Sequence, residues 1–475
     1  MTNVRQLFAR LWNSSVVWSW GFNGLRLASG LLLLPLLVKL LPTERDLGMY
    51  YVFLNIAAVV PMIDFGFTGS IGRAVCCALG GATEIVAYGV APAPGPDSRP
   101  NYELLWRLLH TTRRLYAYLS LGALLLVGVC GTVVVEMRAH ETSSPALTRI
   151  AWAVALTSVI WEIYASWWSS FLYAMNHVLT HARLNLLAHV VKFLIAAGLL
   201  LSGAGLLSVP LAGLVSGLVQ RYLARFFVRR HLARTGIAAP CVTREETREL
   251  FARLWPNSWR QGVISLSNYL STNANSFVCA TVFGLAATAQ YGLSLQIMSI
   301  SQGVAFVWTQ VKWPQVGVLR ARHDSAGIRR LIWPRMWLQN VTFVVLATLG
   351  ILCGPLLLQW WGSQKTLLPT PWLIVAAVCG FLDMQLSFWT ALLTTENRIP
   401  FLRPVVISNG FSLCLALYLV AFSSLEAPAL ILAPLLAGCL FNYWYWPPAG
   451  ARSMQTHWFR FMFASPRWEA AARAN

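Results

Sequence analysis

The stretch Arg114–Glu136, RLYAYLSLGALLLVGVCGTVVVE, carries no charged residue between its two ends. A helix of about 20 apolar residues is long enough to cross the hydrocarbon core of a bilayer. Similar stretches recur along nearly the whole chain, in which 57% of the residues are hydrophobic and only 11% are charged. A soluble protein carries roughly 25% charged residues. The composition therefore predicts a polytopic membrane protein.

The apolar stretches predict twelve membrane-spanning helices and an all-α fold. A spanning segment must satisfy its own backbone hydrogen bonds, which a helix does, and the ten-residue alternation of a membrane β-barrel is missing from this sequence. The predicted spans are 16–40, 47–65, 114–136, 148–174, 182–202, 206–228, 258–281, 286–311, 335–358, 371–394, 402–422 and 427–447.

The basic residues predict the orientation of these spans. Of the 36 Lys and Arg residues, 22 fall in the termini and the even-numbered loops, and only three fall in the odd-numbered loops. Lys and Arg gather in cytoplasmic loops, so both termini are predicted to be cytoplasmic. The first apolar run is long enough to span the bilayer, and we expect it to be retained rather than cleaved as a signal peptide.

The chain repeats itself once. The segment RQLFARLW at residues 5–12 returns as RELFARLW at residues 248–255, and Leu47-Gly48 corresponds to Tyr291-Gly292 at nearly the same offset. Six spans per half give two parallel repeats. The expected domains are an N-terminal six-helix lobe at 1–228, a cytoplasmic linker and amphipathic lead-in at 229–255, a C-terminal six-helix lobe at 256–448 and a basic cytoplasmic tail at 449–475.

Several function classes are disfavoured by the sequence. The net charge is +19, but the basic residues lie between apolar runs, so we expect no nucleic-acid partner. The nine cysteines form no CxxC pair and no ligand spacing with histidine, and we expect no metal. A Walker A sequence and clustered carboxylates are missing as well. We therefore predict no cofactor, no catalytic residue and no enzymatic activity.

Ionisable residues inside spans usually face a cavity or a partner, because burying a charge in lipid is costly. The basic candidates are Arg26, Lys192 and Arg260, for which snorkelling or pairing with an acid is the alternative reading. The acidic candidates, interpreted as ion-coupling groups, are Glu162, Asp64 and Asp383.

Polar residues at helical spacing add further candidates for substrate binding. They are Asn23 in the first span, Asn268, Thr272 and Asn275 in the seventh, and Gln296 in the eighth. Such stripes suit a water-filled lumen or hydrogen bonds between helices. The aromatic group Tyr443–Trp446 at the end of the last span is interpreted as an interfacial belt.

The segment Leu40–Arg73, LLPTERDLGMYYVFLNIAAVVPMIDFGFTGSIGR, has an acid before Leu47-Gly48, aromatics after it and Asp64-Phe65-Gly66 at the end of the second span. This pattern resembles the first hairpin of bacterial polysaccharide transporters. These are the lipid-linked oligosaccharide flippases of O-antigen type in the multidrug/oligosaccharidyl-lipid/polysaccharide (MOP) exporter superfamily.

The resemblance implies a V-shaped, alternating-access fold with a cationic lumen, in the bacterial inner membrane. The implied substrate is an undecaprenyl-diphosphate-linked oligosaccharide of the O-antigen, capsule or exopolysaccharide pathway. Membrane lipids, H⁺ or Na⁺ as coupling ion, a polysaccharide polymerase and glycosyltransferases are the implied partners. Two alternatives stay open, namely an ion-coupled drug/cation antiporter of the same superfamily and a membrane-embedded enzyme of envelope biosynthesis.

Overall fold

In the computed structural model, the described residues form helices joined by turns and loops, and none of them forms a strand. These residues are 12–57, 60–92, 99–237, 240, 242–360 and 367–463. The contacts between residues divide the chain into two compact units. The first comprises Met1–Ile85 and Pro94–Trp255, and the second comprises Val86–Ala93 and Pro256–Asn475.

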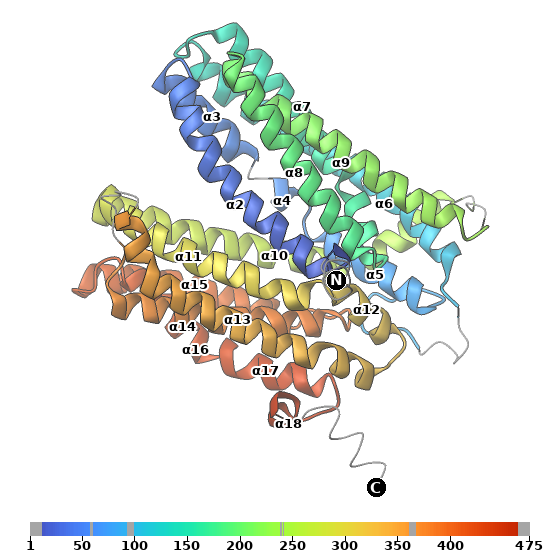
Figure 1. Ribbon diagram of the computed structural model, residues 1–475. Helices are drawn as coiled ribbons and strands as arrows, with labels where there is room; N and C mark the ends of the chain where they lie inside the picture. Colours follow the sequence, from blue (N-terminus) through green and yellow to red (C-terminus); the bar gives the residue numbers. More distant parts are fainter. Residues whose placement is uncertain are drawn as a thin grey trace, which may run out of the picture. The chain divides into compact units, whose positions relative to one another are not determined.

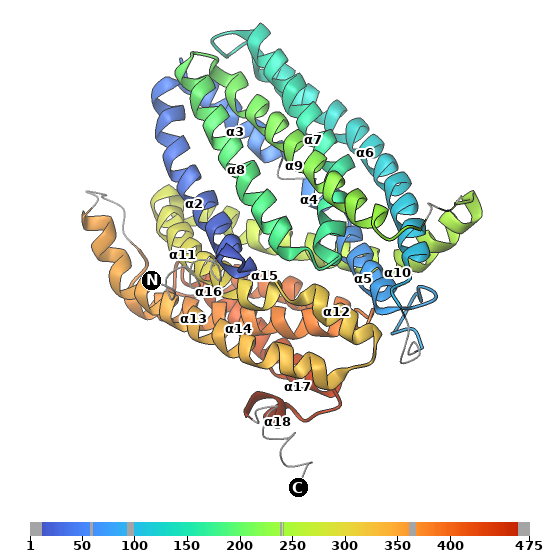
Figure 2. The same cartoon turned by 45° about the vertical axis from the view of Figure 1, so that its right-hand side comes forward.

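The first unit is a bundle in which α7 packs against α6 and α9, and α8 packs against α2 and α9 (Figures 1 and 2). Its elements are α2 (Ser15–Leu40), α3 (Glu44–Ala57), α4 (Val60–Ile63), α5 (Phe67–Gly80), α6 (Tyr102–Ala139), α7 (Pro145–Ala174), α8 (Val178–Leu201), the 3₁₀ turn η1 (Gly205–Leu207) and α9 (Ser208–Ala233).

Helix α6 is longer than the predicted span 114–136, because it begins at Tyr102. The side chain of Asn101 caps it by accepting a 3.0 Å hydrogen bond from the Leu104 backbone N–H. Farther along, the absence of a side chain at Gly131 lets the ring of Trp152 from α7 approach α6 closely. The indole N–H of Trp152 donates to Thr132 Oγ1 at 2.9 Å and fixes this contact.

The turn before α3 is held by a buried carboxylate. Asp46, which is 3% exposed, accepts a hydrogen bond of 2.8 Å from the Thr43 hydroxyl and one of 3.2 Å from the Ser143 backbone N–H. Thr43 Oγ1 in turn accepts from the Asp46 backbone N–H at 3.2 Å, which caps the start of α3. One acidic side chain thereby joins the α2–α3 turn to the α6–α7 turn.

The sequence prediction missed the helix that follows the second span. The chain turns sharply at Phe65 and Gly66, whose φ angles are 47° and 79°, and then forms α5. A positive φ is readily adopted by glycine. One face of α5 is buried in the first unit. A helix at the corresponding place in the second unit, α12 (Trp313–Ala321), was also missed.

The start of α10 (Arg244–Val278) belongs to the first unit as far as Trp255. Its aromatic side chains pack on α5, where the ring centroids of Phe251 and Phe67 lie 5.9 Å apart. Arg253 Nη1 also lies 2.8 Å from the Glu84 carboxylate. The repeat copy at 248–255 is thus part of an amphipathic helix, whereas residues 5–11 of the other copy lie outside the described residues.

The second unit is a bundle in which α11 packs against α13 and α14, and α15 packs against α16 (Figure 1). Besides the rest of α10 and α12, its elements are the π-helical turn η2 (Cys279–Phe283), α11 (Gly284–Gln310), α13 (Ser325–Trp360), α14 (Thr370–Thr394), α15 (Leu402–Phe422), α16 (Ala429–Leu440), α17 (Asn442–Arg452) and α18 (Trp458–Phe463).

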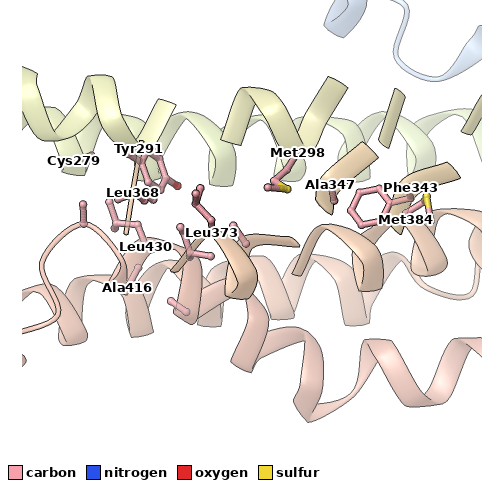
Figure 3. Packing of buried hydrophobic residues seen from close by; sticks show 14 of the residues in the cluster. Cys279, Tyr291, Met298, Phe343, Ala347, Leu368, Leu373, Met384, Ala416 and Leu430 are labelled. Carbon is pink, nitrogen blue, oxygen red and sulfur yellow. The ribbon is translucent and has the colours of Figure 1, made fainter. Parts of the chain in front are cut away.

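The core of the second unit is made chiefly of apolar side chains from α11, α13, α14, α15 and α16 (Figure 3). Met298, Phe343 and Met384 are each less than 5% exposed and belong to one continuous cluster. Burial of side chains of this size stabilises a helix bundle through close packing, which is the main cohesive term between helices in lipid.

The short segment Val86–Ala93 belongs to the second unit although it lies between helices of the first. Its backbone carbonyls accept hydrogen bonds from two asparagine side chains: Asn397 Nδ2 donates to Val86 O at 2.7 Å, and Asn257 Nδ2 donates to Ala87 O at 3.0 Å. His323 Nε2 lies 2.9 Å from Ala91 O. The segment is therefore fixed by polar contacts along its length.

Seven of the described helices are long and apolar enough to cross a membrane, and the number rises to eight if α16 and α17, bent by 44°, form one span. The predicted spans 16–40, 47–65, 258–281 and 286–311 fall on α2, α3–α4, α10 and α11, outside that group. The prediction of an all-α, polytopic fold is confirmed, and the orientation of the termini stays a prediction.

Candidate functional site

A cavity of about 490 Å³ lies within the first unit, lined by residues of α2, α3, α7, α8 and α9. Three charged side chains line it: Glu162, Lys192 and Arg221. The Arg221 guanidinium donates to Ser169 Oγ and lies 3.9 Å from Glu162 Oε1. Since Glu162 offsets one of the two cations, the described lining carries a net positive charge.

Helix α8 presents a polar stripe to this cavity. His181, Asn185, His189 and Lys192 recur at intervals of four, four and three residues, which places them on one helix face. Asn185 Oδ1 accepts from Gln220 Nε2 at 2.6 Å, and His189 Nε2 lies 2.9 Å from Ser29 Oγ. The sequence interpretation named only Lys192 from this face, although the spacing was visible.

A larger cavity, of about 850 Å³, lies within the second unit and has a different character. Its polar lining consists mainly of amides and hydroxyls, contributed chiefly by α10, α11, α14 and α15. Asn409 Nδ2 donates to Asn268 Oδ1 at 2.8 Å, and Gln302 Nε2 donates to Gly380 O at 2.7 Å. The buried Oδ1 of Asn275 accepts no hydrogen bond from a described residue.

Asp383 is the one Asp, Glu, Lys or Arg among the described residues that line this second cavity. Its Oδ1 accepts a 2.6 Å hydrogen bond from the Tyr443 hydroxyl, and the Cys379 thiol lies 3.7 Å from Oδ2. The interpretation of Tyr443 as part of an interfacial belt is wrong, because its hydroxyl serves a carboxylate in the cavity. Tyr443 lies just after the 44° bend between α16 and α17.

No family model matches the chain, and no curated protein matches it. Solved structures do. A variant of the Vibrio cholerae MATE transporter VcmN is similar over 95% of this chain and 97% of its own, with a TM-score of 0.68 and 14% identity. An outward-facing multidrug resistance MATE family transporter of the MOP superfamily matches over 94% and 97%, with a TM-score of 0.65 and 12% identity. This chain has a MATE-like transporter fold.

A further similar structure is that of a MOP superfamily transporter from Pyrococcus furiosus. It matches 94% of this chain and 97% of its own, with a TM-score of 0.63 and 12% identity. For that protein, the reverse polarity of the binding pocket suggests a different function. At such identities the likeness establishes the fold of our chain.

Within the MATE-like fold, the predicted site residues divide into two groups. Glu162 and Lys192 come together in the cavity of the first unit. Asn268, Thr272, Asn275 and Asp383 come together in the cavity of the second unit. Arg221, His181, His189, Gln302 and Tyr443 line these cavities and were not among the predicted site residues.

Among the described side chains, those of Asn23, Gln296, Arg260 and Asp64 line neither cavity. Asn23 is half-buried on α2, and Gln296 is exposed on α11. The Arg260 guanidinium carbon lies 4.9 Å from the ring centroid of Tyr88 and 5.4 Å from that of Trp259, which indicates cation–π packing. Arg26 lies on α2, and its side chain is outside the described residues.

Asp64 has a local structural contact that the sequence did not reveal. Its carboxylate accepts from the Thr68 backbone N–H at 3.0 Å and from the Thr68 hydroxyl at 2.9 Å, at the start of α5. The hydroxyl of the buried Tyr116 on α6 donates to the same carboxylate. Asp64 thus fastens the first turn of α5 to α6. Among the described residues, no group of three His, Cys, Asp or Glu side chains is placed to hold a metal ion.

Proposed function

We propose that this protein is a flippase that moves undecaprenyl-diphosphate-linked oligosaccharide units across the bacterial inner membrane by alternating access. The MATE-like transporter fold and the seven or eight apolar spans support a transporter embedded in a membrane. The flipped lipid would serve cell-surface polysaccharide biosynthesis, with glycosyltransferases supplying it and a polymerase consuming it.

The difference in chemistry between the two cavities is the observation that carries this proposal. The cavity of the first unit offers Lys192 and Arg221, which suit a diphosphate, because cationic donors form the strongest hydrogen bonds to phosphate oxygens. The cavity of the second unit offers amides and hydroxyls, which suit the hydroxyls of a glycan. A lipid-linked oligosaccharide carries both an anionic diphosphate and uncharged sugars, and each of the two linings suits one of these groups.

Ion coupling completes the proposal. Asp383 and Glu162 line the cavities, so a coupling ion that reaches either cavity meets a carboxylate. We assign the main coupling role to Asp383, because no Lys or Arg among the described lining residues neutralises it. Asp64, by contrast, is held by Thr68 and Tyr116, and its proposed part is to position α5.

A drug/cation antiporter is the second candidate. The single carboxylate of the second cavity and the likeness to MATE transporters favour it. A cationic drug would meet Asp383 in one cavity but would face Lys192 and Arg221 in the other. The positive lining of the first unit therefore favours the flippase.

The test is translocation of a fluorescent undecaprenyl-diphosphate oligosaccharide in proteoliposomes. Wild type should move the lipid, Lys192→Gln should slow it by about tenfold, and Asp383→Asn should remove its dependence on an ion gradient. Lys39→Gln is the matched control, since Lys39 is exposed on α2 and lines neither cavity. Export of cationic dyes without movement of the glycolipid would replace the flippase by the antiporter.

A further inference from the structure

A third cavity, of about 530 Å³, lies within the first unit between α6, α7 and α9. It differs from the substrate cavities because the described residues that line it include no Asp and no Glu. Four arginines line it: Arg113, Arg221, Arg225 and Arg229. We call this cavity the arginine–tryptophan pocket, since Trp106, Trp161, Trp167 and Trp168 also line it.

Three of the four arginines of this pocket, all except Arg221, are available to a ligand. Arg225 and Arg229 are one turn apart on α9, and their guanidinium carbons lie 5.9 Å and 6.0 Å from the ring centroid of Trp168. This packing orients the guanidinium groups without neutralising them. Among the described residues, neither these two arginines nor Arg113 lies within ion-pair distance of a carboxylate.

The pocket also gathers buried donors that lack an acceptor. The indole N–H groups of Trp106, Trp161 and Trp167 are buried and have no hydrogen-bond partner among the described residues. The same holds for Nε of Arg221. Buried donors in proteins are nearly always paired, and four unpaired donors around one basic cavity indicate a ligand rich in acceptor oxygens. A phosphate group has that chemistry.

The surroundings of the pocket favour a phosphate that is attached to an apolar chain. All three helices that form it are long and apolar enough to span a membrane. Leu218 and Tyr222, which also line the pocket, are 41% and 69% exposed and present apolar surface beside the arginines. Arg225 and Arg229 lie toward the basic end of α9, where a phospholipid headgroup would meet an interfacial Trp and Arg cluster.

We propose that the arginine–tryptophan pocket binds the phosphate headgroup of an anionic phospholipid. The guanidinium groups compensate its charge, the indole N–H groups donate to its oxygens, and the acyl chains lie along Leu218 and Tyr222. The proposal does not depend on which substrate the protein transports.

The test is native mass spectrometry of the full-length protein, delipidated in detergent and then offered defined lipids. Wild type should retain phosphatidylglycerol about tenfold more strongly than phosphatidylcholine, and Arg225→Gln/Arg229→Gln should abolish that preference. Arg230→Gln/Arg234→Gln is the matched control, because it removes the same charge from exposed residues of the same region that do not line the pocket. It should keep the preference.

One further variant and one competition measurement complete the test of lipid binding. Trp161→Phe keeps an aromatic ring but removes the indole N–H together with the five-membered ring, so it should weaken phosphatidylglycerol retention even if the double variant folds poorly. Free glycerol phosphate should not displace the lipid at equal concentration. Equal losses in the pocket and control variants, or displacement by glycerol phosphate, would overturn the proposal, because the first indicates general charge attraction and the second a soluble phosphate ligand.

Discussion

The Tyr443 hydroxyl donates a 2.6 Å hydrogen bond to Asp383 Oδ1 and thereby joins α17 to α14. Both residues belong to the lining of the polar cavity of the second unit. The bond also connects one half of the bent pair α16–α17 to a helix that meets the criterion for a membrane span. The position of α17 is thus coupled to the carboxylate that we assign to ion coupling.

Replacing Tyr443 by Phe should lower the stability of the second unit. The ring is kept, but Asp383 loses its donor, and a hydrogen bond of this type contributes about 1–2 kcal/mol. The thermal midpoint of the detergent-purified protein should fall. Tyr445→Phe is the control, because the Tyr445 hydroxyl makes no hydrogen bond within the part of the chain that the structure describes. Equal midpoints for the two variants would contradict the assignment.

Asn275→Ala should weaken binding of the glycan. Oδ1 of Asn275 is buried in the cavity lining and accepts no hydrogen bond from a described residue, so we expect it to accept one from a sugar hydroxyl. Loss of one such bond corresponds to a fall in affinity of roughly two- to tenfold. The half-saturating glycolipid concentration in the proteoliposome assay measures it. The neighbouring Asn273→Ala should leave that concentration unchanged, since Asn273 does not line the cavity.

Gly131→Ala should destabilise the first unit. A Cβ at this position would lie 2.6 Å from Trp152 Cη2, which forces α6 and α7 apart. Overpacking of this kind costs about 1–3 kcal/mol. Gly122→Ala on the same helix meets no atom within 4 Å and should be neutral or slightly stabilising. The difference between the two thermal midpoints is the measurement, and a fall for Gly122→Ala as large as that for Gly131→Ala would show that helix packing is not responsible.

Asp46→Ala should lower the stability of the protein more than most single substitutions outside the cavities. It leaves the Thr43 hydroxyl and the Ser143 backbone N–H without their acceptor, at a cost of roughly 2–3 kcal/mol. Asp324→Ala removes an exposed cap from α13 and should cost only about 1 kcal/mol. Unfolding of both variants followed by tryptophan fluorescence gives the comparison. A smaller effect at Asp46 than at Asp324 would reject the bridging role.

The His177 and His231 pair should make stability depend on pH. His177 Nε2 lies 3.0 Å from His231 Nδ1, and burial, with a smaller contribution from His231, lowers the pKa of His177 below its ordinary value. His177 therefore takes up a proton at about pH 6.5 in the unfolded chain, but only at a lower pH in the folded protein. Stability should be full above about pH 6.5 and should fall as the pH is lowered toward the folded pKa.

His177→Gln removes this titration. The thermal midpoint of the variant should change less between about pH 7 and about pH 5 than that of wild type. His457→Gln serves as the control, since His457 lies at the start of α18 and stacks only on Phe459 among the described rings. An unchanged pH profile in His177→Gln would show that other groups are responsible.

The features of this protein that depend on local sequence were predictable, and those that depend on packing were not. Long apolar runs revealed the helices because the bilayer requires about 20 apolar residues of each. Helices α5 and α12 were missed because they are short, and their buried faces gain stability only from neighbours.

The residues of the candidate site divide in the same way into those that local sequence reveals and those that only packing reveals. Lys192, Asn268 and Asp383 were recognised because a polar residue inside an apolar run is conspicuous. Arg221 lies near the end of its predicted span, where snorkelling is an adequate explanation, and only its contacts with Ser169 and Glu162 place it at a cavity. Tyr443 was misread because the bend between α16 and α17 has no signal in the hydropathy of the sequence.

Each unit contains a segment from the other half of the chain: Val86–Ala93 belongs to the second unit, and Arg244–Trp255 belongs to the first. This matters when the protein is divided into fragments. A chain cut near residue 240 would yield two polypeptides that each carry a segment needed to complete the packing of the other. Neither fragment would then be an autonomous domain, and co-expression should rescue what separate expression loses. The two halves would behave as a split protein, in which exchanged segments replace the covalent link.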